Sequence, residues 1–256
     1  MSGSEGRGAG ALDVLAVGAH PDDVELGCGG TVALLARAGR RVGILHLTGG
    51  EAGTRGTADE RRAEAEAAAS ALGAAELLFL DCGDGRFRNG PEEEDALIAL
   101  LRRHRPELVL APTPGDRHPD HGRAHRLVAD GAFYAGLAAR KPPGAPDLPP
   151  HRPAAVLAYM QHDPFEPSLV VDVSPVWEVK ERALDCYRSQ IYQRDERRDE
   201  PATKVATREF RLAMEGRARH FGLMIGAAHG EPFWSRLPLA VGDAATLLGL
   251  LPGGVR

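Results

Sequence analysis

The chain has 256 residues, of which 43% are hydrophobic and 26% charged, and its formal net charge is -5. A chain of this length can bury a sizeable core, and its acidic balance argues against non-specific binding to nucleic acid. It also lacks an apolar run of about 18 residues, the minimum for a membrane-spanning helix. The 3 cysteines are far apart and include no CxxC pair, which favours reduced thiols in the cytoplasm over a disulfide framework.

In the first half of the chain, apolar strands alternate with helices. We predict strands at residues 12–18, 42–48, 77–80 and 108–111, and helices at residues 31–38, at residues 57–72, from residue 91 and from residue 121. Thr57 suits a helix N-cap, Gly73 a helix end and Pro91 a first helical turn. Near-continuous apolar strands separated by helices are typical of a parallel sheet covered on both faces. The predicted fold class is therefore α/β, a Rossmann-like, doubly wound and mostly parallel sheet.

The second half is expected to add further strands and helices to the same domain. In chain order we predict a proline-rich connection at 141–153, strands at 155–159 and 169–173, an amphipathic helix around 177–187, a polar mobile loop at 193–201 and a helix at 203–221. The segment GEPFW at residues 230–234 carries aromatic side chains that we expect to be exposed and to cover a subunit interface. We expect a single domain over residues 12–256, after a flexible, glycine- and serine-rich tail over residues 1–11.

Two motifs rich in histidine and aspartate follow predicted strands. The run AHPDD at residues 19–23 follows the first strand, and the run DRHPDH at residues 116–121 follows the fourth. Either motif alone is compatible with an ordinary turn or helix start, since proline and aspartate are common turn formers. In the common strand order 3-2-1-4-5, however, ligands bind outside the carboxyl ends of strands one and four. Topology therefore predicts that the two motifs meet in one site.

The residue types in these motifs favour a metal centre. Two imidazoles and a carboxylate, with one position left for water, suit zinc, and we predict His20, Asp23 and His121 as the ligands. The same ligand types occur in non-haem iron(II) sites, so Fe2+ stays open as the cofactor. Asp22 is left beside the metal, where it would take a proton from water as a catalytic base.

Two other residues of the second motif are predicted to assist. His118 would act as an imidazolium that stabilises an oxyanion and protonates a leaving group. Asp120 would hold a ring N–H of one of the histidines. Among the other histidines, His46 lies inside an apolar strand and is predicted to be a core residue, whereas the role of His162, just after a strand, stays open.

These residues resemble the LmbE-like (PIG-L) family of zinc-dependent N-acetylglucosamine deacetylases. The resemblance rests on AHPDD, on the loop GGEAGTRG at residues 49–56 and on RHPDH at residues 117–121. Later segments, among them YRSQ at residues 187–190 and GEPF at residues 230–233, are similar to one branch of the family, the deacetylase of bacillithiol biosynthesis.

The resemblance implies the same metal ligands and the same base as the residue types do, with His118 assisting the transition state. It also implies a homo-oligomer, such as a hexamer, and a small amino-sugar substrate, N-acetylglucosaminyl malate, which would lose acetate. Arg55 lies in the glycine-rich loop and would bind a sugar hydroxyl or a malate carboxylate.

Three alternatives stay open at this point. The first is deacetylation of another N-acetylglucosamine conjugate, such as a chitooligosaccharide or a different thiol precursor. The second is a nucleotide-binding Rossmann protein, although no G-x-G-x-x-G fingerprint follows the first predicted strand. The third is a non-catalytic metal-binding protein, which would leave Asp22 and His118 without a role.

Overall fold

The computed structural model describes residues 10–193, 201 and 203–243, and these contain one seven-stranded sheet in the order β3-β2-β1-β4-β5-β7-β6. The elements are β1 (Val14–Gly18), α1 (Asp23–Arg37), β2 (Val42–His46), α2 (Ala58–Leu72), β3 (Glu76–Phe79), α3 (Pro91–His104), β4 (Leu108–Pro112), α4 (Pro119–Ala135), β5 (Ala155–Tyr159), β6 (Leu169–Asp172), η1 (Ser174–Val176), α5 (Trp177–Cys186), α6 (Arg208–Met224) and β7 (Gly230–Ser235). Strands β1 to β5 are mutually parallel, and β7 pairs antiparallel with both β5 and β6. The predicted doubly wound, mostly parallel sheet is confirmed.

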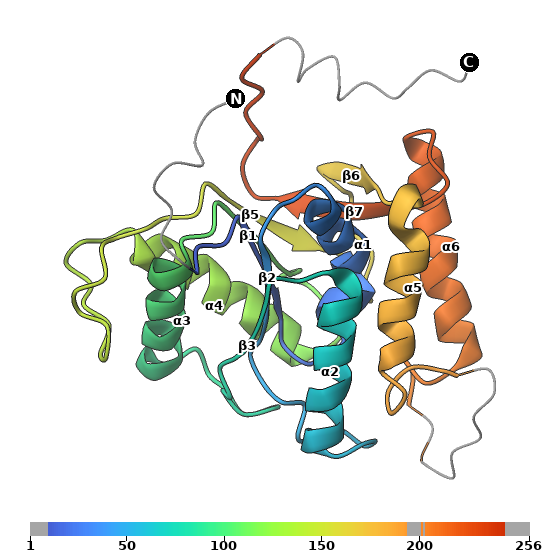
Figure 1. Ribbon diagram of the computed structural model, residues 1–256, viewed down its shortest axis with the longest axis horizontal. Helices are drawn as coiled ribbons and strands as arrows, with labels where there is room; N and C mark the ends of the chain where they lie inside the picture. The colour runs from blue at the N-terminus through green and yellow to red at the C-terminus, as the bar shows by residue number, and fades with distance from the viewer. Residues whose placement is uncertain (1–9, 194–200, 202, 244–256) are drawn as a thin grey trace.

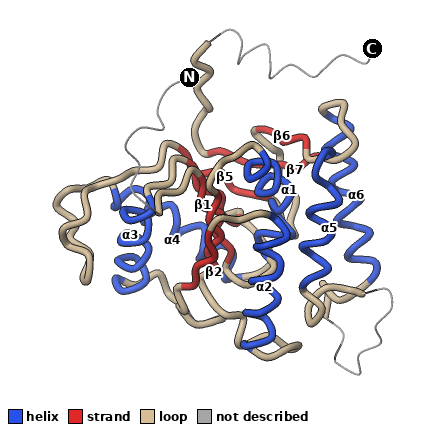
Figure 2. The backbone as a smooth tube through the Cα atoms, in the orientation of Figure 1, coloured by secondary structure: helices blue, strands red, loops and turns tan. Residues whose placement is uncertain are grey.

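Helices cover both faces of this sheet, as Figure 1 and Figure 2 show. On one face α3 and α4 bury side chains such as Leu101 and Leu127. On the other face α1, α2 and α5 bury Val32, Leu72 and Leu184. Burying each such aliphatic side chain contributes about 1.5–3 kcal/mol, so the two apolar layers hold the strand ends in fixed positions.

The local signals for helix ends are confirmed in α2 and α3. The Thr57 hydroxyl accepts a hydrogen bond from the Glu60 backbone N–H at 3.2 Å, and the Glu60 carboxylate accepts one from the Thr57 N–H at 2.8 Å. This reciprocal capping box satisfies two donors that the first turn leaves unpaired. Gly73 ends α2 with φ 76°, a left-handed conformation that favours glycine, and Pro91 opens α3.

Helix α1 differs from the prediction because it begins at Asp23, well before residue 31. It passes through a non-helical residue, Cys28, with φ -145° and ψ 20°. A Cβ on Gly27 would lie 2.1 Å from the Tyr159 ring. The glycines in this segment therefore allow α1 to pack closely against β5, and they do not mark a loop.

The C-terminal part of the sheet contains the clearest correction. The segment expected to be an exposed aromatic tail forms β7, which lies between β5 and β6, and Phe233 is fully buried. Proline lacks an N–H for the strand ladder and is therefore disfavoured in an interior strand. Pro232 nevertheless lies opposite Val170 in the ladder with β6. Helix α6 begins at Arg208, after the N-cap Thr207, somewhat later than predicted.

Two predicted segments cannot be compared with the structure. Residues 1–9 of the predicted tail, and residues 194–200 of the predicted polar loop, lie outside the described residues. In the part of the chain that is described, no helix combines the length and apolar character needed to cross a membrane.

Candidate metal centre

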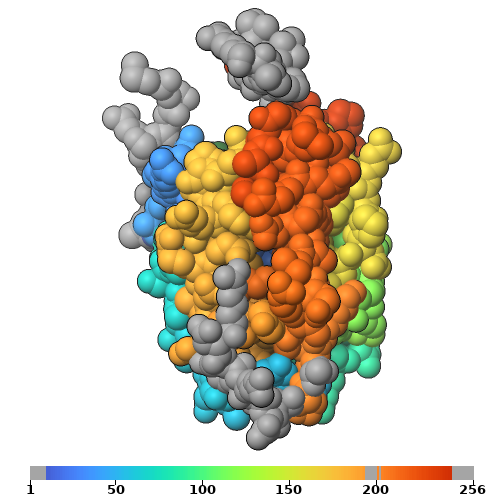
Figure 3. All heavy atoms as spheres, turned by 90° about the vertical axis from the view of Figure 1, so that its right-hand side faces the viewer, coloured from blue at the N-terminus to red at the C-terminus, as the bar shows by residue number. Residues whose placement is uncertain are grey.

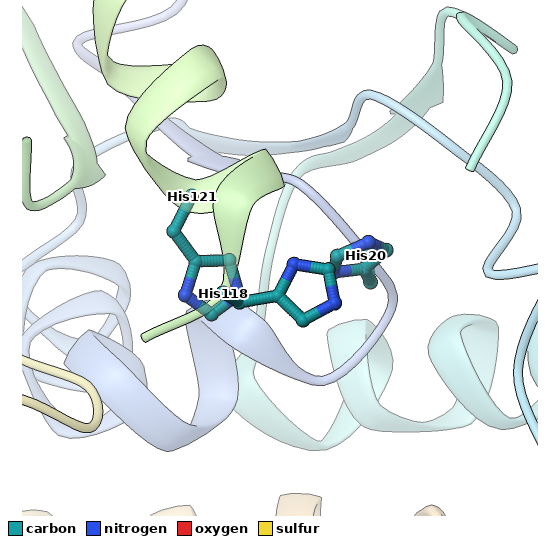
Figure 4. A group of neighbouring side chains, drawn as sticks. All are labelled: His20, His118 and His121. Atoms are coloured by element: carbon teal, nitrogen blue, oxygen red, sulfur yellow. The ribbon is translucent and has the colours of Figure 1, made fainter. Parts of the chain in front are cut away.

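The two motifs meet at the carboxyl ends of β1 and β4, which are neighbours in the sheet. Ring nitrogens of His20, His118 and His121 lie within 4.8 Å of one another. Figure 4 shows His118 and His121 at the start of α4 and His20 in the turn after β1, with the three rings gathered together. The topological prediction of one shared site is therefore met.

The backbone of each motif explains how the side chains converge. Asp22 has φ 100°, in the left-handed region that aspartate tolerates better than most residues, and this turns the chain sharply into α1. The Asp23 carboxylate accepts a hydrogen bond from the His20 N–H at 2.8 Å and so braces the turn. At the other motif, Nδ1 of His118 accepts from the Asp120 N–H at 3.2 Å and caps α4, which places His121 in its first turn.

Asp23 lies between two of the histidines. Its Oδ2 is 3.5 Å from Nδ1 of His20, and its Oδ1 is 3.2 Å from Nε2 of His121. Gln161, which follows β5, donates its Nε2–H to the same Oδ1 at 2.5 Å. The three predicted ligands thus form one buried group, with all three exposed by no more than 7%.

Other carboxylates engage the opposite sides of the two rings. Nε2 of His20 is 3.1 Å from Asp84 and 3.4 Å from Asp120, and Nδ1 of His121 is 3.3 Å from Asp116. In each ring, therefore, one nitrogen faces Asp23, and the other faces a carboxylate outside the predicted ligand set. This is the arrangement in which a carboxylate orients a metal-binding imidazole.

The electrostatics of the group favour positive charge. Burial alone would lower the pKa of His121, but the carboxylates of Asp23 and Asp116 outweigh it and raise the pKa to about 9. Burial likewise opposes protonation of His20, yet Asp120, Asp23 and Asp84 together raise its pKa well above the ordinary value. The donors present, two imidazoles and a carboxylate in a buried acidic surround, fit a divalent cation such as zinc or iron(II).

Asp22 differs from Asp23 although the two are adjacent. Burial raises the pKa of Asp22 to about 7, against the opposing charge of Arg61, whose Nη2 is 3.9 Å away. For Asp23, burial is outweighed by His121 and His20, which hold its pKa well below the usual range. Arg61 also donates to the carbonyls of Pro21 and Gly50 at 2.8 Å, and so ties α2 to the turn that carries Asp22.

The environment of His118 argues against the predicted imidazolium. Burial and the neighbouring rings of His20 and His121 lower its pKa. Its Nδ1 already accepts a hydrogen bond, so a neutral ring carries its proton on Nε2. A neutral donor at Nε2 is the form that this geometry supports.

Arg55 lies in the glycine-rich loop between β2 and α2 and is partly buried. Its carbonyl accepts a hydrogen bond from the Gln190 side chain at 2.6 Å, which connects the loop to the YRSQ segment. A substrate-binding role for its guanidinium stays a prediction.

Sequence reasoning left four residues of the site without a role, namely Asp84, Asp116, Gln161 and His162. Asp116 is next to the second motif, and Asp84 and Gln161 each follow a strand that ends at the same edge of the sheet. The ring of His162 stacks on His121, with centroids 5.7 Å apart and an interplanar angle of 6°. Their positions after strand ends are the signal that was available, since the carboxyl ends of parallel strands lie at one edge.

The chain is similar to known proteins over most of its length. The family model described as GlcNAc-PI de-N-acetylase (PIG-L) matches residues 15–132, which contain both motifs. A diacetylchitobiose deacetylase from Thermococcus kodakarensis is 35% identical over 189 residues, covering 70% of this chain and 70% of the relative. A 4-oxalmesaconate hydratase from Pseudomonas putida is 31% identical over 197 residues, covering 69% of this chain and 73% of the relative.

Among solved structures, a conserved protein from Thermus thermophilus is similar over most of its length. The TM-score is 0.79 at 37% sequence identity, and the match covers 91% of this chain and 99% of the other. The similarity therefore extends past the family model and includes the C-terminal strands and helices.

Proposed function

The chain belongs to the PIG-L family of GlcNAc-PI de-N-acetylases, and we propose that it is a zinc-dependent amide hydrolase that removes the N-acetyl group from N-acetylglucosaminyl malate. The observation that carries this proposal is the convergence of AHPDD and DRHPDH on one buried group of two imidazoles and a carboxylate. The malate substrate is supported by the branch-level resemblance of the later segments. The Thermococcus relative supports the broader class, since it is a diacetylchitobiose deacetylase.

His20, Asp23 and His121 would hold the metal, through Nδ1 of His20 and Nε2 of His121, the ring nitrogens that face Asp23. When bound, zinc would supply Lewis-acid chemistry by polarising the acetamide carbonyl and lowering the pKa of a water molecule. Iron(II) would suit the same donors. The three-imidazole group offers a rival ligand set in which His118 replaces Asp23, and the variants below separate the two.

The remaining residues would move the protons. Asp22 is buried beside the group, with its carboxylate 3.9 Å from Nη2 of Arg61, and it would take a proton from the attacking water. His118 would donate a hydrogen bond from its Nε2–H to the oxyanion that forms on the acetamide carbonyl, without giving up the proton. Because a neutral His118 has no spare proton, Asp22 would then pass the proton to the departing amine, and the C–N bond breaks to release acetate.

Two further residues have supporting parts in this proposal. Asp120 accepts a hydrogen bond from the Gly85 N–H at 2.7 Å and faces His20, so it would keep that ring oriented. Arg55 would bind a sugar hydroxyl or a carboxylate of the substrate.

The test couples metal analysis of the purified protein to amine release from N-acetylglucosaminyl malate, with diacetylchitobiose as the competing substrate. We expect Asp22→Ala to keep the metal and to lose turnover by about 10²–10⁴-fold. Asp23→Ala should lose the metal, whereas His118→Ala should keep it. If His118→Ala lost the metal and Asp23→Ala kept it, the three-imidazole set would be correct; if diacetylchitobiose alone released amine, the malate assignment would be wrong.

The Pseudomonas relative supports a second candidate, a hydratase. Both activities need an activated water and a carboxylate base, so the site alone does not separate them. Assaying 4-oxalmesaconate beside the two amide substrates does, because only a hydratase would consume it without releasing an amine.

We also propose a homo-oligomer, such as a hexamer, from the same branch-level resemblance, and a cytoplasmic location from the widely spaced cysteines. At the end of α6, Leu223 and Met224 are 79% and 59% exposed, which supports an apolar contact surface. Light scattering of the purified protein measures the mass; a monomer at micromolar concentration would exclude the proposal.

A further inference from the structure

A cavity of about 480 Å³ lies between α6 and the segment that follows β5. The segment contributes Met160, Gln161 and His162, and α6 contributes Phe210, Met214 and Arg217. Figure 3 shows α6, in orange, along the outer face of the molecule. The cavity is therefore built mainly from the half of the chain that the family model does not cover.

The inner wall of the cavity touches the candidate metal centre. Gln161 donates to the Asp23 carboxylate, and the His162 ring stacks on His121. In an N-acetylglucosaminide the glycosidic oxygen is on the carbon next to the one that carries the acetamide. A group attached to that oxygen must therefore lie close to the centre, and this cavity is a space that directly adjoins it.

The charge of the lining has one sign. Lys204 and Arg217 contribute positive charge, and none of the described residues that line the cavity is acidic. The Arg217 guanidinium donates to the carbonyls of Gln161 and Leu26, and no carboxylate in the described part of the chain lies within ion-pair distance of it. The guanidinium also contacts the Met214 sulfur at 3.3 Å, and since none of these partners is charged, its positive charge is available to an anion.

Much of the remaining lining is apolar, although Gln161, His162 and His220 are polar. Met160 and the side chains of Met214 and Phe221 are buried, and Phe210 adds an aromatic face. A second sugar ring would need many hydroxyl partners, which these side chains do not provide. A short hydrocarbon segment bearing carboxylate groups fits both parts of the lining.

We propose that this cavity is the subsite for the group attached to the sugar, and that Lys204 and Arg217 make it select a group that carries a carboxylate. The inference rests on the proposed deacetylase function and deepens it, because it names the residues that would distinguish a carboxylate-bearing conjugate from a neutral one. The family motifs lie elsewhere in the chain, so this selectivity is a property of the residues after β5 and of α6.

The test compares N-acetylglucosaminyl malate with its dimethyl ester, which has the same skeleton but no charge. The wild-type enzyme should show a KM at least about tenfold lower for the diacid, as expected for charge-assisted hydrogen bonds. Lys204→Ala should reduce that preference about two- to fivefold, the range for an exposed charge, and Arg217→Gln should reduce it about tenfold. Arg219→Ala is the matched control, because Arg219 is also on α6 but is exposed, paired with Glu215 and outside the cavity lining.

Equal KM values for diacid and diester in the wild type would overturn the proposal, as would equal effects of Lys204→Ala and Arg219→Ala. Arg217 also bonds the backbone, so its variant is checked for a folded state by thermal melting, and the exposed Lys204 carries the test if it unfolds. If no N-acetylglucosamine conjugate releases an amine, the deacetylase function fails. Calorimetric binding of malate then tests the carboxylate site by itself. The proposed carboxylate site is supported only if Lys204→Ala weakens malate binding and Arg219→Ala does not.

Discussion

Two buried groups of charged side chains lie along α1 and differ in how completely they are hydrogen-bonded. The Asp23 cluster, made of His20, Asp23 and His121, is at the start of the helix. The Glu231 cluster, made of Glu231, Lys180 and Thr31, follows its kink. All six side chains are buried, so the difference between the clusters does not come from exposure.

The Glu231 cluster is closed. Glu231 accepts hydrogen bonds from the Gly30 N–H at 2.9 Å, from the N–H and hydroxyl of Thr31 at 2.7 and 2.6 Å, and from Lys180 Nζ at 2.6 Å. Lys180 also donates to the Leu26 carbonyl at 3.1 Å. Every carboxylate oxygen and the ammonium have partners, and the group joins β7 and α5 to the kink of α1.

The Asp23 cluster is not closed in this way. Its acidic surround raises the pKa of both imidazoles, which burial alone would lower, so the cluster favours positive charge. Asp116 keeps one buried carboxylate oxygen without a hydrogen-bond partner among the described residues. A closed cluster indicates a structural role, whereas an open one that demands positive charge indicates a site for a ligand.

The largest expected effect comes from breaking the Asp23 cluster. His121→Ala should abolish stoichiometric metal binding and lower turnover by about 10³-fold or more, since metal-assisted hydrolysis is worth several kcal/mol. Metal content by mass spectrometry and amine release measure this. His125→Ala, one turn further along α4, is the control, because its ring bonds the Pro112 carbonyl and lies outside the cluster. Equal losses in both variants would mean that α4 is merely disturbed.

Breaking the Glu231 cluster should instead cost stability. Lys180→Met leaves a buried carboxylate without its cation, which typically destabilises a protein by about 3–5 kcal/mol. Chemical denaturation measures the loss, and the activity of the molecules that remain folded should be retained. The double variant Lys180→Met with Glu231→Gln should recover part of the loss; if it is as unstable as the single variant, the ion pair is not the cause.

A smaller effect is expected at the edge of the Asp23 cluster. Asp116→Asn weakens the contact that orients His121, and such outer contacts typically contribute about 10–100-fold to metal affinity. Competition with a chelator measures the affinity. Asp130→Asn, on α4 but paired with Arg126 at the surface, should leave it unchanged. An affinity equal to that of the wild type in Asp116→Asn would show that backbone packing alone positions the ring.

The two clusters also differ in how far they can be predicted from sequence. The Asp23 cluster comes from two short motifs, and strand order alone brings them together, so its ligands can be named without coordinates. Gln161 could not be assigned, because its contact with Asp23 joins residues 138 positions apart and depends on the exact end of β5. The Glu231 cluster was not predicted. It depends on β7, whose Pro232 is untypical of an interior strand, and on a kink in α1 that is set by packing.

A third buried ionisable side chain, Glu25, lies on α1 between the two clusters. Burial raises the pKa of its carboxyl group from 4.5 to about 8, and the nearby charge of Asp22 acts in the same direction. Between these two pH values the folded protein binds a proton that the unfolded chain has released. Stability contributed by this group is therefore lost as the pH rises from about 4.5 to about 8.

Glu25→Gln removes this titration while keeping the size and shape of the side chain. Measured in chelator, so that no metal adds its charge, the variant should gain stability over the wild type as the pH rises from 5 to 8, by at most about 1.4 kcal/mol for each pH unit. Glu66→Gln, on the exposed face of α2, should follow the wild-type curve. Parallel curves for Glu25→Gln and the wild type would mean that Glu25 stays ionised when buried. Asp23 would then no longer stand alone as the buried carboxylate at this end of α1 that keeps its charge.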